Sequence, residues 1–161
     1  MDDDTPYRLA HEASVRAIED QAAVLESLRS RAGTMFAAAA IVTSFFGSQA
    51  LTEAGVDLQP WSLVGLAVAA FVLTGLFTIL ILWPFDFWFS VSATEMLDIV
   101  EDREPEQPVT GREAYRELAL RLELNYDHNA PVVKRLIWLF RLAILCLGIE
   151  VAAWIAVLWR L

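Results

Sequence analysis

Three long apolar runs dominate the pattern of this chain. They cover Gly33–Leu51, Trp61–Trp83 and Leu136–Leu158, and none of them contains Lys, Asp or Pro. A helix of about 20 apolar residues crosses the hydrocarbon core of a bilayer. Because lipid offers the backbone no hydrogen bonds, helices are the favoured spanning structure. The pattern therefore predicts an all-α integral membrane protein with three transmembrane helices.

The polar segment before the first run has a helical period of its own. Residues 7–32 contain no Gly or Pro, and an apolar stripe recurs every three or four residues. The stripe consists of Val15, Ile18, Ala22 and Leu25. This spacing predicts an amphipathic helix. Since nothing stops that helix before Gly33, we expect residues 1–32 to form a tail and a long N-terminal helix that is continuous with the first span.

The remaining segments complete the predicted organisation. Residues 33–83 form a two-span hairpin with a loop at 52–60. Residues 84–133 form a short helical insertion, and residues 134–161 carry the third transmembrane helix. Within the insertion we expect helices at Thr94–Val100 and Gly111–Asp127 around the polar loop Asp102–Thr110.

Two features mark the ends of the insertion. Pro84 should end the second span, and the ring-rich segment Phe85–Phe89 after it fits an aromatic belt at the membrane interface, or else a gate or docking surface. At the other end, Asn129 is placed to cap a new helix with Pro131 in its first turn.

The distribution of Lys and Arg predicts the topology. Bases lie before the first run and between the second and third, whereas the 52–60 loop has none and carries Glu53 and Asp57. By the positive-inside rule, the N-terminus and the insertion then face the cytoplasm and the C-terminus faces outward. The acidic start of the chain is unlike a cleavable signal peptide. We expect a multi-pass protein of the bacterial inner membrane, with the lipid bilayer as its first partner.

Composition narrows the chemistry further. The chain is 57% hydrophobic, carries a net charge of −9, and has Cys146 as its one cysteine. No metal-ligand spacing, glycine-rich phosphate loop or nucleophile motif occurs, so we expect no enzyme, no cofactor and no metal site. Asp127-His128 are sequence neighbours that face different ways on a helix. The bases are interleaved with acids, which argues against nucleic acid as a partner.

One acid stands inside the third apolar run. Glu150 lies about thirteen residues from one end of Leu136–Leu158 and eight from the other. An ionisable group within a span is costly and usually faces a partner or a cavity. Arg141 is too far along the same helix to pair with it. Three interpretations stay open: hydrogen bonding to hydroxyls of neighbouring spans, lining of an oligomeric pore or crevice, and a proton or cation relay. The candidate intramembrane hydroxyls are Thr43, Ser44, Thr74 and Thr78.

Small residues suggest where helices pack. Gly148, Ala152 and Ala156 repeat every four residues beside Glu150, and Gly65 and Ala69 do so in the second run. Small residues at this spacing let helices approach closely. We expect contacts between spans, and self-association into a homo-oligomer.

Several sequence segments resemble a known group of proteins. They are Leu25–Ala32 leading into the first run, Leu82-Trp83-Pro84 followed by Trp88-Phe89-Ser90, and Leu118–Asn129 leading to Arg135-Leu136. In these the chain is similar to small bacterial membrane proteins related to SLATT and Pycsar-type transmembrane effectors. The resemblance covers residues 8–158. This chain departs from many such proteins in having a third span and no separate sensor domain.

The resemblance implies a function in antiphage defence. Effectors of this kind are thought to oligomerise and damage the inner membrane when triggered, through a cytoplasmic protein or a second-messenger-linked partner. The leading hypothesis is an oligomeric inner-membrane effector that forms a pore or perturbs the membrane. The alternatives are a small ion channel or transporter that uses Glu150, and a non-catalytic scaffold that docks a cytoplasmic partner.

Overall fold

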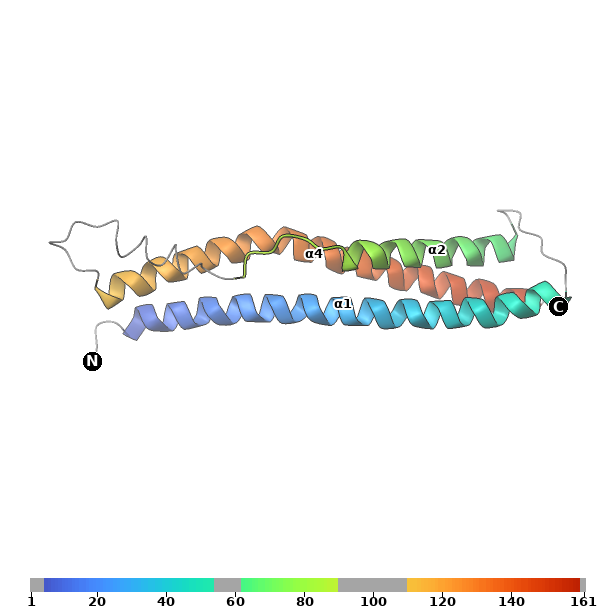
Figure 1. Ribbon diagram of the computed structural model, residues 1–161, viewed down its shortest axis with the longest axis horizontal. Helices are drawn as coiled ribbons and strands as arrows, with labels where there is room; N and C mark the ends of the chain where they lie inside the picture. Colours follow the sequence, from blue (N-terminus) through green and yellow to red (C-terminus); the bar gives the residue numbers. More distant parts are fainter. Residues whose placement is uncertain (1–4, 54–61, 90–109, 160–161) are drawn as a thin grey trace. The chain divides into compact units, whose positions relative to one another are not determined.

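The described part of the chain is built of three helices. The computed structural model describes residues 5–53, 62–89 and 110–159, and of residues 50–53 only the backbone. The helices are α1 (Thr5–Glu53), α2 (Leu63–Leu82) and α4 (Gly111–Leu158), and these residues contain no strand (Figure 1). The all-α prediction is confirmed. The expected helix Thr94–Val100, and most of the loops 52–60 and Asp102–Thr110, lie outside the described residues.

Helix α1 is continuous over 49 residues, as the absence of a helix stop before Gly33 predicts. The hydroxyls of Ser14 and Thr34 donate to carbonyls four residues earlier, at Ala10 and Ser30. Hydroxyls bonded in this way leave no polar group unsatisfied on the helix surface. The N-terminal amphipathic segment and the first apolar run therefore belong to one uninterrupted element.

Contacts divide the chain into two units. The first, here called the polar unit, combines Met1–Glu26 with Phe85–Lys134. The second, here called the apolar unit, combines Ser27–Pro84 with Arg135–Leu161. Each unit has its own buried residues, and each is described separately below.

In the polar unit two residues of the predicted stripe of α1 are buried, and the other two, Val15 and Ala22, are half-buried. Ile18 and Leu25 are each 4% exposed, and Leu122 of α4 is 6% exposed. Gln21, on the same face of α1, donates its side-chain amide to the Tyr126 carbonyl at 3.3 Å. At the chain's N-terminal side, the Arg112 guanidinium donates to the Tyr7 hydroxyl at 2.7 Å. Apolar burial thus sets the packing of this unit, and a few polar bonds fix its register.

The prediction that Asn129 caps a new helix is wrong. Helix α4 continues through this region with Pro131 inside it. Asn129 is fully buried, and its side chain bonds both ways to the Trp88 backbone: it accepts from the N–H at 3.1 Å and donates to the C=O at 2.9 Å. The Trp88 ring also stacks on His128 at 4.4 Å. The asparagine therefore holds the segment after α2 rather than starting a helix, because extended backbone supplies the donor and acceptor that its amide needs.

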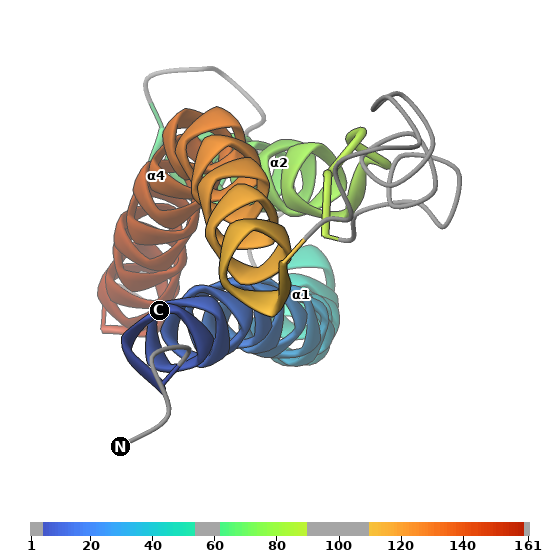
Figure 2. The ribbon, with the colours of Figure 1, turned by 90° about the vertical axis from the view of Figure 1, so that its left-hand side faces the viewer.

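In the apolar unit, α2 runs antiparallel to α1 and α4 (Figure 1). Seen end on, the three helices of this unit lie at the corners of a triangle (Figure 2). Ala67, Ala153, Trp154 and Val157 form a buried cluster, against which Val42 and Phe46 of α1 also pack. Small residues on α2 and α4 leave room at this point for the large indole ring.

A close approach of α1 and α2 depends on a glycine. A Cβ added at Gly75 would lie 2.9 Å from Cε2 of Phe36, whose ring stacks on Phe71 with centroids 5.7 Å apart. Each end of α2 has a capping contact. Ser62 caps the start of α2 by accepting from the Gly65 N–H, and α2 ends at Leu82, with Trp83 as its C-cap before Pro84. Arg29 of α1 donates to the Trp83 carbonyl at 3.4 Å. At least one backbone group at each end of α2 is therefore hydrogen-bonded to a side chain.

Two of the described helices, α2 and α4, are long and apolar enough to cross a membrane. The expectation was three. The run Gly33–Leu51 is helical, but Ser48 and Gln49 lower its apolar character near the end of α1. Only 33% of the most apolar stretch of α2 and 22% of that of α4 are buried. Since the core helix of a soluble protein is mostly buried, this exposure favours lipid as the surrounding medium.

The two bonds between Asn129 and Trp88 can be tested by amide hydrogen exchange. In Asn129→Ala the Trp88 N–H loses its acceptor, so we expect its exchange to be about tenfold faster, as loss of one ordinary hydrogen bond implies. Asn125→Ala, one turn earlier on α4, should leave the rate unchanged. Equal rates in Asn129→Ala and the unaltered chain would contradict the assignment.

The close approach at Gly75 can be tested against a matched glycine. Both Gly75→Ala and Gly148→Ala gain helix propensity, about 1 kcal/mol. Only Gly75→Ala meets a neighbour, because a Cβ at Gly148 has nothing within 4 Å. We expect thermal unfolding in detergent to give a lower Tm for Gly75→Ala than for Gly148→Ala, since overpacking costs about 1–3 kcal/mol. A Gly75→Ala protein at least as stable as Gly148→Ala would contradict the contact.

Candidate functional site

The intramembrane acid is bonded to a hydroxyl from another helix. Glu150 of α4 is fully buried, and Thr43 Oγ1 of α1 donates to its Oε1 at 2.6 Å. This is the first of the three arrangements left open by the sequence, a hydrogen bond between neighbouring helices. The structure thus brings together Glu150 and one of its four candidate hydroxyls.

A tryptophan completes the group. Trp154 lies one turn after Glu150 on α4, is 1% exposed, and donates its Nε1–H to Thr43 Oγ1 at 3.2 Å. The oxygen of the Thr43 hydroxyl therefore accepts a hydrogen bond from the indole N–H, and its O–H donates one to the Glu150 carboxyl group. Trp154 is four residues from Glu150 and so lies on the same side of α4, but the sequence did not reveal it as a donor to this group. The available signal was its indole N–H, which usually finds a partner when it is buried.

The second oxygen of the carboxyl has a different environment. Glu150 Oε2 is buried and, within the described residues, makes no hydrogen bond. A buried polar atom without a partner is destabilising by about 1–3 kcal/mol. Glu150 therefore carries an unused hydrogen-bonding position inside an otherwise apolar helix bundle.

The other candidate hydroxyls do not join this group. Ser44 is exposed, and Thr74 donates to the Ala70 carbonyl of its own helix at 2.9 Å. Thr78 is 2% exposed, with a hydroxyl that makes no bond in the described part of the chain. Along α2, Thr78 lies eleven residues, or about 16 Å of helical rise, from Ala67. Ala67 is the α2 residue that belongs to the same buried cluster as Trp154. The predicted set therefore does not form one continuous polar lining in a single chain.

The predicted small-residue faces point largely away from the helix contacts. Gly148, Ala152 and Ala69 are exposed, and Gly65 and Ala156 are half-buried. The close contacts of α2 are instead made by its buried face, which comprises Ala67, Ala70, Thr74, Gly75, Thr78 and Ile81. The idea that Gly148 and Ala152 pack against a helix thus applies only to a neighbouring copy, and it stays a prediction.

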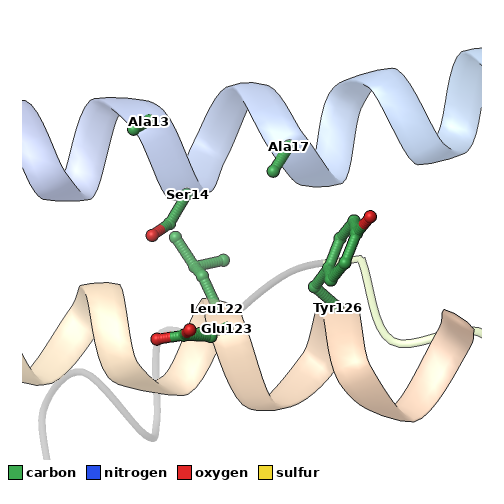
Figure 3. Close-up of a pocket in the computed structure, with 6 residues that line it drawn as sticks. All are labelled: Ala13, Ser14, Ala17, Leu122, Glu123 and Tyr126. Atoms are coloured by element: carbon green, nitrogen blue, oxygen red, sulfur yellow. The ribbon is translucent and has the colours of Figure 1, made fainter.

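A separate groove lies in the polar unit, between α1 and α4. It has a volume of about 320 Å³ and is open to its surroundings. Its lining consists of Ala13, Ser14, Ala17, Leu122, Glu123 and Tyr126 (Figure 3). On the same two helices, Leu9 and Leu124 are 56% and 69% exposed. The groove is a shallow and mainly apolar surface with one acid at its rim.

Across the described ranges 5–53, 62–89 and 110–159, no group of three His, Cys, Asp or Glu side chains could hold a metal ion. What the Glu150 group can do is accept and donate hydrogen bonds within an apolar unit.

Comparison with known proteins adds no relative. No family model, curated protein or solved structure matches the chain. The resemblance to SLATT and Pycsar-type effectors therefore stays a prediction, and the function has to be argued from the geometry itself.

The Thr43 hydroxyl can be tested with a neighbouring control. Thr43→Val keeps the shape of the side chain but leaves both Glu150 Oε1 and Trp154 Nε1 without their partner. We expect a loss of about 1–2 kcal/mol in unfolding free energy, measured by titration with a denaturing detergent. Ser44→Ala removes the adjacent, exposed hydroxyl and should change little. Equal effects of the two substitutions would show that the bonded group is not a stabilising element.

Proposed function

We propose that this chain is a non-enzymatic inner-membrane protein that self-associates and permeabilises the bilayer when triggered, as an effector of antiphage defence does. In this proposal α2, the second half of α4 and the run Gly33–Leu51 cross the membrane. The N-terminus and residues 84–133 face the cytoplasm, and the C-terminus faces outward. The charge distribution supports this topology through the positive-inside rule.

The observation that carries the proposal is the unused oxygen of Glu150. A fully buried acid with one bonded and one unbonded oxygen is a costly group in an apolar bundle. Water, or a polar group of a second copy, would satisfy Oε2 if the helices separated around it. In the assembled state Glu150 and Thr43 would then line the opening. The resting chain keeps them together through the bond between Thr43 and Glu150.

The wide apolar surface of α2 and α4 supports self-association as well as contact with lipid. Large side chains on both helices are exposed, for example Val72 at 59% and Leu145 at 59%. Beside them Gly148 and Ala152 offer a face on which a second helix could approach closely. A ring of such chains is compatible with a pore, whereas a single chain encloses no channel among its described residues.

A second candidate is favoured by the groove of the polar unit. A shallow, mainly apolar groove, with exposed leucines such as Leu9 and Leu124 elsewhere on the same helices, suits the docking of a cytoplasmic protein, as in the scaffold alternative. A small ion channel or transporter using Glu150 remains the third candidate, because the free oxygen could also take up a proton or a cation.

Permeabilisation can be measured in cells and in liposomes. Overexpression of the full chain raises its concentration in the membrane and so favours self-association without the trigger. It should depolarise the membrane, and the protein reconstituted at a high protein-to-lipid ratio should release an entrapped dye. Glu150→Leu removes the polar group, so we expect it to abolish both effects, whereas Glu150→Gln, which keeps hydrogen bonding, should retain dye release. Thr74→Val is the control, because Thr74 bonds within its own helix.

The outcomes separate the candidates. Intact potential and tight liposomes at verified expression would overturn the effector proposal and favour docking. Flux that depends on an ion gradient and is lost in Glu150→Gln would favour the transporter.

A further inference from the structure

All four bases among the described residues of the apolar unit gather toward one end. They are Arg29 and Arg31 of α1 and Arg135 and Arg141 of α4. Arg29 reaches the Trp83 carbonyl, so the C-terminal end of α2 lies at their level. The bond between Thr43 and Glu150 sets α1 and α4 in register, and fourteen residues back on each helix are Arg29 and Leu136. The bases of both helices therefore lie toward the same end of the unit, and Arg141 is the deepest of them.

The apolar unit itself has no described carboxylate at that end, and the nearest ones along the chain lie just outside it, at Glu26, three residues before Arg29, and at Asp86. In the described residues of the apolar unit, acids occur only at Glu53, the last residue of α1, and at Glu150. Glu53 is 24 residues from Arg29, about 36 Å along the helix, and Glu150 is buried and bonded to Thr43. The basic end thus has a charge that the unit itself does not compensate.

Of these bases, Arg141 is the one whose charge is most costly to place in a membrane. It lies six residues inside Arg135, about 9 Å deeper in the apolar run, and its side chain is exposed. Its guanidinium carbon stands 5.4 Å from the centre of the Trp138 ring. Among the described residues it forms no ion pair. An exposed charge at this depth of a membrane helix is costly unless a counter-charge reaches it or the side chain extends back to the interface.

Arg135, Trp138 and Arg141 form a single ridge on α4. They recur every three residues, so each lies beside the next along one row that turns by about 120° around α4 between Arg135 and Arg141. All three are exposed, Trp138 at 61%. The guanidinium groups carry planar arrays of donors that match the oxygens of a phosphate, and the indole is a side chain that favours the headgroup level.

We propose that this ridge is a binding site for an anionic phospholipid, whose headgroup phosphate lies between Arg141 and Arg135 and whose chains run along the exposed apolar face of α4. Charge complementarity carries the proposal, because the site offers two arginines and no acid. A second copy of the apolar unit would bring more bases and, apart from the Glu53 end and the buried Glu150, no described carboxylate. Lipid is therefore the partner whose chemistry fits.

The inference rests on the part of the proposed function that places α4 in the bilayer, and it does not depend on permeabilisation. A protein that releases no dye can still bind the lipid selectively. A protein without lipid preference can still form a pore. The two proposals therefore fail separately.

The experiment is native mass spectrometry of the full chain in detergent, titrated with phosphatidylglycerol or with phosphatidylcholine of the same chain length. We expect selective binding of phosphatidylglycerol. Arg141→Gln should weaken it about fivefold and Arg135→Gln/Arg141→Gln about 25-fold, at roughly the contribution of one arginine near an anionic surface each. Binding of phosphatidylcholine should not change.

Arg31→Gln is the matched control, since Arg31 is exposed at the same level but lies on α1. It should change the affinity for phosphatidylglycerol less than twofold. Equal losses in Arg31→Gln and Arg141→Gln would indicate diffuse attraction and overturn the site, as would undiminished binding in the double variant. Dimers that form without lipid and dissociate in Arg141→Gln would show that a carboxylate of a second copy, and not a lipid phosphate, pairs with Arg141. That result would also overturn the lipid site.

Helicity and elution volume report whether each variant is folded. If Arg141→Gln does not fold, Arg135→Gln alone carries the test: a loss of about fivefold supports the ridge, and unchanged affinity overturns it.

Discussion

A carboxyl group inside an apolar helix bundle must find its hydrogen bonds there, and this constraint organises the apolar unit. Glu150 meets it with the Thr43 hydroxyl, which in turn accepts the Trp154 indole N–H. These two bonds set the register between α1 and α4. The indole ring then needs space, and Ala67 and Ala153 provide it within the same buried cluster. The hydrogen bond to Glu150 Oε1 and the close packing around the indole thus depend on the same few residues, while Oε2 has no partner among the described residues.

Much of the fold follows from periodicity and from the absence of helix stops. The long apolar runs predict helices, and the lack of Gly and Pro before Gly33 predicts the continuity of α1. The error at Asn129 has a physical origin. A cap motif is a local signal, and it competes with a tertiary contact that the local sequence does not reveal, namely the backbone of Trp88 lying alongside α4. Pro131 was read as a start because proline favours the first turn, yet a long helix tolerates its missing N–H.

The candidate site was predictable in kind but only partly in membership. An acid in an apolar run must have a partner, and hydroxyls of the other helices were the available ones. Which hydroxyl it meets depends on the register between helices, and no residue pattern within one helix fixes that. Thr43 is level with Glu150, Ser44 faces outward, and Thr78 lies too far along α2. The small-residue faces were predicted only in part for a related reason. Their spacing shows that another helix can approach closely, but not whether a helix of the same chain lies there.

The bond from Arg29 to the Trp83 carbonyl joins two residues that are far apart in the chain. In the proposed topology, Arg29 is one of the bases that would orient the first apolar run under the positive-inside rule. In the folded chain the same guanidinium is bonded at the C-terminal end of α2. Because α1 and α2 run antiparallel, a hairpin with a shifted register would carry the Trp83 carbonyl away from Arg29. One side chain thus ties the end of α2 to one register of the hairpin.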